Sequence, residues 1–220
     1  MPPRPLKQVN KDAKVNTVGE YAALQAQHVS LQAARCIAAW TQVELLLGAS
    51  LVGLLGAKVR PAMAMLAALT SSQAQTAATE AAALTVLTDE KKTLFQATLQ
   101  AIRKAGKRRN HLAHWIWAYS NDLPDCLLFI EPKEYIESLI VLKETEDTEN
   151  PTRAFKIIEG VWVYTMADMI ELREYIHRAA SIAAQLIRLS DPNPEIVAQV
   201  MRQLSREPEI QKILARQART

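Results

Sequence analysis

Glycine, cysteine and aromatic residues are scarce in this sequence of 220 residues, which contains 6 Gly and 2 Cys and is 5% aromatic. Because alanine and leucine are abundant instead, the composition favours a mainly helical protein. The two cysteines, Cys36 and Cys126, have no CxxC spacing and lie in apolar surroundings, so we expect two buried free thiols rather than a disulfide. Apolar residues make up 49% of the chain and allow a substantial core.

An excess of charge of one sign is also missing, since 26 Lys and Arg residues face 23 Asp and Glu residues and leave a net charge of +3. This balance excludes a polycationic protein, so any attraction for nucleic acid has to come from a local patch. Residues 1–17 contain bases and three prolines but no apolar h-region. We therefore expect a flexible N-terminal tail, no signal peptide and a cytoplasmic protein.

One long apolar run, residues 36–57, contains a single charge, Glu44, in 22 residues. A helix of that length could cross a bilayer. However, Thr41, Gln42 and Glu44 are costly in hydrocarbon, and no cluster of basic residues flanks both ends. We expect this run to form the central helix of a soluble bundle, with no membrane contact.

Apolar residues recur at spacings of three and four along most of the chain, which predicts a bundle of helices. The expected helices cover residues 18–56, 61–70, 90–120, 166–189 and two shorter stretches within 195–220 that divide near Glu207. Residues 71–80 are either a polar link or a further helix. Gly106 costs about 1 kcal/mol in a helix interior relative to alanine, so we expect a bend or break there. Thr165, followed by Asp168, predicts a capped start for the helix over 166–189.

Shorter patterns interrupt the helices between about residues 126 and 164. The segments DCLLFIEP (125–132), RAFKIIEG (153–160) and VWVYT (161–165) are typical of short strands, and YIESLIVLKE (135–144) is either a strand or a short helix. The sequence thus predicts a tail over 1–17, a mainly α helical domain over 18–190 with a small β insertion, and a C-terminal helical appendage over 191–220.

The segment KAGKRRNHLAHWIWAYSND, residues 104–122, holds half of the histidines and half of the tryptophans of the chain. If it is helical, Arg109, Asn110 and His114 fall within one sector of the helix, because successive residues are turned by about 100°. Small Ala113 lies in the same sector and leaves room for a substrate. His111 is a neighbour of His114 but points away from Arg109, so we expect it to matter less.

These residue types suit cleavage of a phosphodiester bond assisted by the 2′-hydroxyl of RNA. A guanidinium can hold phosphate oxygens in a bidentate fork, an imidazole can give or take a proton near neutral pH, and the Asn110 amide can orient either partner. No acidic or thiol ligand completes a metal site around His111 and His114, so we expect neither a metal nor another cofactor. The alternative is that Arg109 pairs with an acid, His114 caps a core and the nearby tryptophans only pack.

The hexapeptide RNHLAH, residues 109–114, resembles the signature of HEPN domains, in which an Arg is followed after four to six residues by a His. The resemblance extends over about residues 18–190 in the order of the long helices. It implies an all-helical bundle that dimerises with its two motif helices facing each other and that, in many members, cleaves RNA without a metal. Arg109 would then bind phosphate, His114 would act as general acid or base, and Asn110 would position them.

Two other properties of HEPN domains bear on this chain. Many toxin members carry a Tyr two residues after the motif His, where this chain has Ile116. Regulation through that tyrosine is therefore not implied. Some members lack activity and serve as binding or scaffold modules.

Supporting residues are expected around the motif. Glu44 is an isolated carboxylate in an apolar run and should be buried against Arg108 or Arg109, unless it faces solvent at the helix edge. Five cations, namely Arg103, Lys104, Lys107, Arg108 and Arg109, form either a solvated face or, doubled in a dimer, a phosphate-binding groove. Trp117 and Tyr119 either stack unpaired RNA bases in that groove or belong to the core.

The sequence therefore predicts a homodimer of HEPN type that acts as an RNA-cleaving toxin or defence protein. Its partners would be RNA and an antitoxin or another regulatory protein. The alternative is a non-catalytic helical module of the same type that binds a partner protein or a nucleotide.

Overall fold

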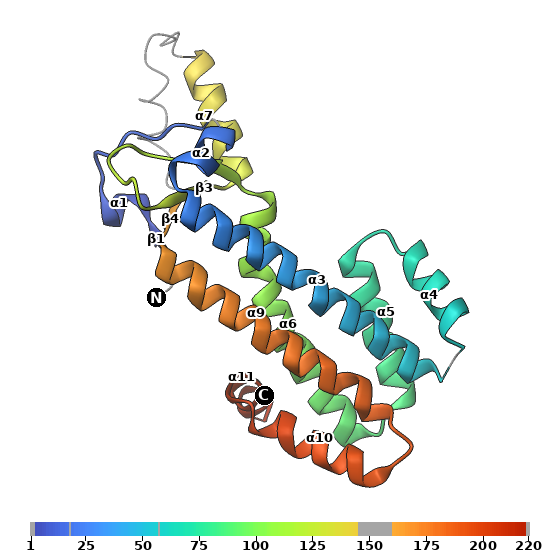
Figure 1. Ribbon diagram of the computed structural model, residues 1–220. Coiled ribbons are helices and arrows are strands. Elements are labelled where there is room, and N and C mark those ends of the chain that lie inside the picture. The colour runs from blue at the N-terminus through green and yellow to red at the C-terminus, as the bar shows by residue number, and fades with distance from the viewer. Residues whose placement is uncertain (1–2, 18, 57, 145–159, 219–220) are drawn as a thin grey trace. The chain divides into compact units, whose positions relative to one another are not determined.

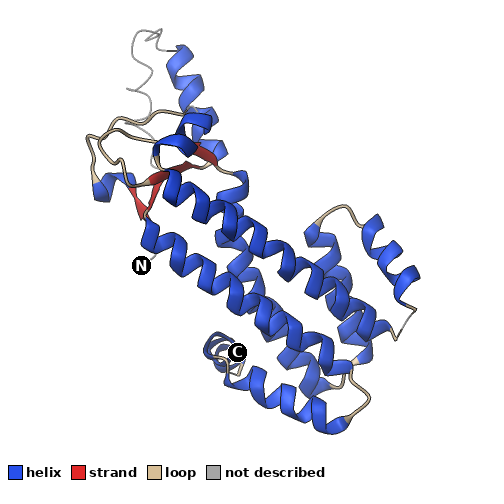
Figure 2. Cartoon of the chain, viewed as in Figure 1, coloured by secondary structure: helices blue, strands red, loops and turns tan. Residues whose placement is uncertain are grey.

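The computed structural model describes residues 3–17, 19–56, 58–144 and 160–218. These residues are mainly helical and include one small antiparallel sheet, as expected from the sequence (Figures 1 and 2). The chain divides into two compact units, Met1–Ala38 with Lys107–Glu174 and Ala39–Gly106 with Tyr175–Thr220. Three long helices contribute residues to both units: α3 (Gln27–Leu55), α6 (Asp89–His114) and α9 (Met166–Ile187).

The first unit contains the sheet, whose strands are β1 (Arg4–Pro5), β2 (Ile116–Ala118), β3 (Leu127–Ile130) and β4 (Val161–Tyr164). Their order is β1-β4-β3-β2, and all neighbouring strands are antiparallel. Every residue of β3 is buried. The strands expected within 125–132 and 161–165 are confirmed, whereas the strand expected over 153–160 falls, apart from Gly160 in a turn, outside the described residues.

Several helices belong to the same unit as the sheet. They are α1 (Leu6–Val9), α2 (Gly19–Gln25), α7 (Pro132–Glu144) and the adjoining parts of α3, α6 and α9. The segment that could have been strand or helix is thus the helix α7. The predicted cap of α9 is confirmed, because the Thr165 N–H donates to Asp168 Oδ2 at 2.8 Å and the Asp168 N–H donates to Thr165 Oγ1 at 3.3 Å.

The N-terminal residues differ from the flexible tail that the sequence predicts. Leu6, Ala13 and Val15 are buried in one apolar cluster with residues of β2, β3 and β4. The backbones of Asn16 and Tyr119 exchange two hydrogen bonds of 2.9 Å. The apolar side chains of this segment therefore pack against one face of the sheet.

The helix that carries RNHLAH is shorter than expected, because α6 ends at His114 and not near residue 120. Residues 116–118 instead form β2, in which Trp117 lies opposite Phe129 of β3. Isoleucine and tryptophan favour extended backbone when a neighbouring strand offers hydrogen bonds. The extended pairing therefore overrides the helical pattern after His114.

The second unit is helical. Besides parts of α3, α6 and α9 it contains α4 (Val59–Ala68), α5 (Ser72–Val86), the short 3-10 helix η1 (Arg188–Ser190), α10 (Pro194–Arg206) and α11 (Pro208–Gln217). The segment 71–80, left open between link and helix, starts α5, and Ser71 Oγ caps it by accepting from the Ala74 N–H at 3.1 Å. The expected division of the C-terminal helices at Glu207 is confirmed.

The long apolar helix α3 is the one described helix whose length and composition would allow a membrane crossing. Within its most apolar window, 39% of the residues are buried. A core helix of a soluble protein can have the same length and composition, so the structure is compatible with the expected soluble bundle. Cys36 on this helix is a buried free thiol, and burial raises its pKa to about 11. Cys126 is also free but only half-buried.

Gly106 does not break α6, whose helical backbone continues from Asp89 to His114. A Cβ atom at this position would lie 2.9 Å from Cη2 of the Trp40 indole. Trp40 is itself fixed, since it is buried and its Nε1–H donates to Glu44 Oε1 at 2.9 Å. The glycine therefore provides room for the close approach of α3 to α6 inside the second unit.

We expect Gly106→Ala to lower the free energy of unfolding by about 1–3 kcal/mol, as overpacking against a rigid ring usually does. This loss should exceed the gain of about 1 kcal/mol in helix propensity. Urea unfolding of Gly106→Ala, Trp40→Phe and the double variant would measure it, and the smaller ring should reduce the cost. A Gly106→Ala protein as stable as wild type would show that Trp40 moves freely.

Candidate functional site

The last two turns of α6 carry the motif residues Arg109, Asn110 and His114 on regular helix. Asn110 and His114 are exposed, and Arg109 is half-buried. The Arg109 Nη1–H donates to Asn110 Oδ1 over a long distance of 3.4 Å. Asn110 is therefore placed to orient the guanidinium, and the imidazole of His114 is open to solvent at the end of the helix.

Most basic neighbours of Arg109 are already neutralised by acids of this chain. Arg103 pairs with Glu80, Lys104 with Glu209 at 2.8 Å, and Arg108 with Glu171 at 3.5 Å. Hydrogen bonds from Lys104 and Lys212 lower the pKa of Glu209 to about 2. Exposed ion pairs are weak and could exchange with a phosphate, but three of the five expected cations do not present a free charge.

Arg109 differs from these neighbours. In the part of the chain that the structure describes, no acid forms an ion pair with Arg109, and its Nε is buried without a hydrogen-bond partner. A guanidinium with unused donors is a ready partner for phosphate oxygens, which it can hold through two parallel hydrogen bonds. Lys107, two residues earlier, is exposed. Of the five cations in residues 103–109, Lys107 and Arg109 are thus the two without an ion pair among the described residues.

Glu44 has two hydrogen-bond partners within the second unit. Its side chain is half-buried, and Oε1 accepts hydrogen bonds from Trp40 Nε1 at 2.9 Å and from Ser72 Oγ at 2.8 Å. An indole four residues earlier and the start of α5, both in the second unit, thus supply partners for the carboxylate. Arg108 and Arg109 belong to the first unit, so the expected ion pair stays a prediction.

His111, which the sequence analysis set aside, is held by more contacts than His114. Its Nδ1 lies 3.0 Å from the hydroxyl of Tyr164 on β4. Its ring stacks on Trp115 with centroids 3.8 Å apart and planes 11° apart. Burial lowers the pKa of His111, Arg108 lowers it further, and Glu131 opposes them. The partner Tyr164 was missed because nothing in a strand pattern shows which helix residue it faces.

Trp117 and Tyr119 belong to the sheet region and not to the face of α6. Trp117 is half-buried, packs edge-on against Phe129 with centroids 5.6 Å apart, and donates its Nε1–H to the Leu112 carbonyl at 2.9 Å. Tyr119 is half-buried and bonds Asn16 through its backbone. The packing interpretation fits both residues better than the base-stacking interpretation.

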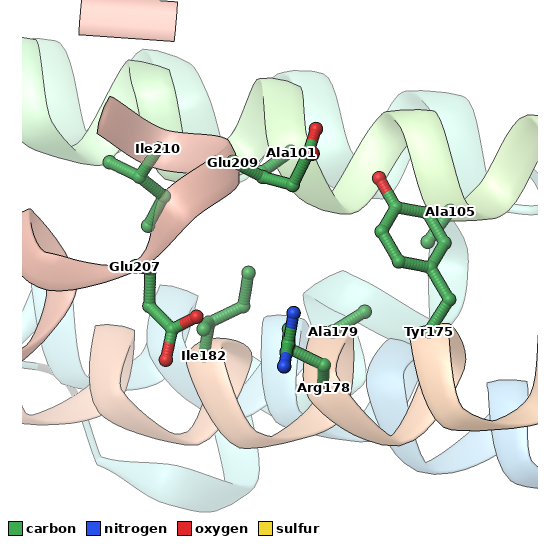
Figure 3. A pocket seen from close by; sticks show the side chains of 9 residues that line it. All are labelled: Ala101, Ala105, Tyr175, Arg178, Ala179, Ile182, Glu207, Glu209 and Ile210. Atoms are coloured by element: carbon green, nitrogen blue, oxygen red, sulfur yellow. The ribbon is translucent and has the colours of Figure 1, made fainter. Parts of the chain in front are cut away.

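A pocket in the second unit lies between α6, α9 and the start of α11 (Figure 3). Ala101 and Ala105 of α6 line one side, Arg178 and Ile182 of α9 line the other, and the start of α11 contributes Glu209 and Ile210. Its interior of about 10 Å³ has room for roughly one water molecule. None of the motif residues Arg109, Asn110 and His114 is among the residues that line it.

Groups of three or more His, Cys, Asp or Glu side chains that could hold a metal ion do not occur among the described residues. The pair His111 and His114 therefore has no third ligand there. Comparison of the chain with family models, with curated proteins and with solved structures found no match. The function therefore has to be inferred from the residues of α6 and their surroundings.

The lowered pKa of His111 makes stability depend on pH. The unfolded chain binds this proton more readily than the folded chain does, so the free energy of unfolding should be highest above about pH 6.5 and fall as the pH drops through that value. Urea unfolding at about pH 7.5 and about pH 5 should show a smaller loss for His111→Gln, which cannot titrate. Equal losses in both proteins would contradict the assignment.

Proposed function

We propose that this protein is a metal-independent endoribonuclease of HEPN type. The observation that carries the proposal is the guanidinium of Arg109, which has no acidic partner among the described residues although three neighbouring cations each have one. Structural arginines are normally paired when partly buried, because an unpaired buried donor costs free energy. A half-buried guanidinium without an acidic partner among the described residues supports a role in binding an anion that comes from outside the chain.

The chemistry follows from three side chains on α6. Arg109 holds the phosphate oxygens and stabilises the negative charge that develops on them as the 2′-hydroxyl attacks phosphorus. His114, which is exposed, transfers a proton to or from the reacting oxygens. Asn110 keeps the guanidinium in place through its Oδ1. None of these steps needs a metal ion.

The biological setting belongs to the same proposal. One motif supplies a single free imidazole, whereas cleavage needs a base for the 2′-hydroxyl and an acid for the leaving oxygen. Two copies of α6 related by a two-fold axis would supply both and double the charge of Lys107 and Arg109. We propose a cytoplasmic homodimer that acts as a toxin or defence ribonuclease, controlled by an antitoxin or another regulatory protein.

A second candidate is a non-catalytic module of the same type that binds a partner protein or a nucleotide. The observation that favours it is the outer side of α7, where Ile136, Leu139 and Ile140 are all exposed. Adjacent exposed apolar side chains often mark protein-binding surfaces. The ion pairs of Arg103, Lys104 and Arg108 favour it too, since they leave less charge for RNA.

Purified protein should cleave labelled single-stranded RNA in excess EDTA. Arg109→Ala and His114→Ala should each lower the rate by at least about 10²-fold, the usual loss when a charge-stabilising or proton-transferring group is removed. Circular-dichroism melts should stay near that of wild type, because His114 is exposed and Arg109 forms no ion pair among the described residues.

Arg35→Ala and His28→Ala are matched controls, since both residues are exposed on α3 and outside the motif. His111→Ala is not a suitable control, because it removes the contacts with Tyr164 and Trp115. Loss of activity in EDTA, or full activity of His114→Ala, would contradict the mechanism. A wild-type protein that is inert on RNA but co-purifies with a partner would favour the second candidate.

The composite site requires a dimer in solution. Light scattering at micromolar concentration should give twice the 24.5 kDa mass of one chain. A disulfide between two copies of Ala113→Cys, which replaces an exposed residue between Asn110 and His114, should form if the motif helices face each other. A stable monomer, or a dimer that this cysteine never links, would rule out the shared site.

A further inference from the structure

His114 occupies the weakest position of its helix. It is the last residue of α6, and the final carbonyls of a helix have no partners within it, so the last turn tends to fray. Here the residues that follow the helix donate hydrogen bonds to carbonyls of that turn. The Trp115 N–H donates to the His111 carbonyl at 3.0 Å, and the Trp117 indole N–H donates to the Leu112 carbonyl at 2.9 Å.

Two stacked rings connect the two ends of the same turn. His111 and Trp115 lie four residues apart, and their rings are parallel with centroids 3.8 Å apart. His114 lies between them in the sequence and bears neither contact itself. A stack that joins residues 111 and 115 limits the backbone angles of every residue between them, His114 included.

Tyr164 ties this stack to the sheet. It is 2% exposed, and its ring packs edge-on against Phe129 with centroids 4.9 Å apart. Its backbone is paired with Leu127 in the central part of the sheet. The hydroxyl of this fixed side chain reaches His111 Nδ1 at 3.0 Å. The sheet thus holds the helix end through one hydrogen bond.

We propose that Tyr164 is a positioning residue that acts through His111 and Trp115 to hold the last turn of α6, and with it His114, in one conformation. The proposal rests on the proposed function for its catalytic consequence. An exposed proton-transfer group at a fraying helix end would sample many positions, and small displacements of such a group reduce rates strongly. The contacts among Tyr164, His111 and Trp115 confine His114 and leave both of its ring nitrogens free of these contacts.

The protonation states of the two partners fit this role. Burial raises the pKa of Tyr164, so the phenol keeps its proton and can donate it to Nδ1. Burial also lowers the pKa of His111, so the ring stays neutral at neutral pH and can accept at Nδ1. Arg108, paired with Glu171 on α9, and Glu131, after β3, are the charged groups that act on His111.

Tyr164→Phe tests the hydrogen bond between Tyr164 and His111, because it keeps the ring against Phe129 and removes only the hydroxyl. Amide hydrogen exchange at Trp115 should become about three- to tenfold faster, as expected for the loss of one hydrogen bond. Exchange at Thr98, buried earlier in α6, should stay unchanged. Tyr21→Phe, which removes an exposed hydroxyl on α2, is the matched control.

RNA cleavage then provides the second measurement. Tyr164→Phe should lower kcat while leaving KM near the wild-type value, because RNA is held by Arg109 and not by Tyr164. Unchanged exchange at Trp115 would overturn the proposal, and so would faster exchange with an unchanged kcat. If wild-type protein cleaves no RNA, the proposed function fails, whereas the exchange data still decide whether Tyr164 holds the turn that carries His114.

Discussion

The pairing of β2 with β3 is the constraint on which the geometry of the candidate site depends. Residues 116–118 must be extended to form this pairing, so α6 cannot continue beyond His114. The histidine is thereby placed at a helix end that faces solvent, and Trp115 occupies the bend. The same pairing places Trp117 close to the helix end, where its indole N–H donates to the Leu112 carbonyl.

Local sequence signals predicted much of the fold. Apolar spacing predicted α3, α6 and α9, the Thr165 and Asp168 pair predicted a helix start, and Glu207 marked the break between α10 and α11. Interactions between distant segments were not predictable in this way. The end of α6 depends on β3, and the order of the N-terminal residues depends on the sheet face that Leu6 covers, so neither is visible in its own local pattern.

The candidate site shows the same limit. The sequence displays Arg103, Lys104, Arg108 and Arg109 as equivalent charges, but their state depends on acids from distant helices. Glu80 of α5, Glu209 of α11 and Glu171 of α9 neutralise three of them, which leaves Arg109 available. Likewise, composition could not show that Tyr164 would fix His111, because that contact joins a strand to a helix 53 positions earlier in the chain. Which residues are free to act is therefore decided by tertiary packing.

We propose that Arg109 is the guanidinium that binds an RNA phosphate. NMR of the arginine Nε–H groups during titration with a short 2′-O-methyl RNA, which cannot be cleaved, tests it most directly. We expect the Arg109 signal to shift together with the His114 ring signals, while the Arg103 signal, paired with Glu80, stays in place. A shift at Arg103 without one at Arg109, or no shift at low salt, would contradict the claim.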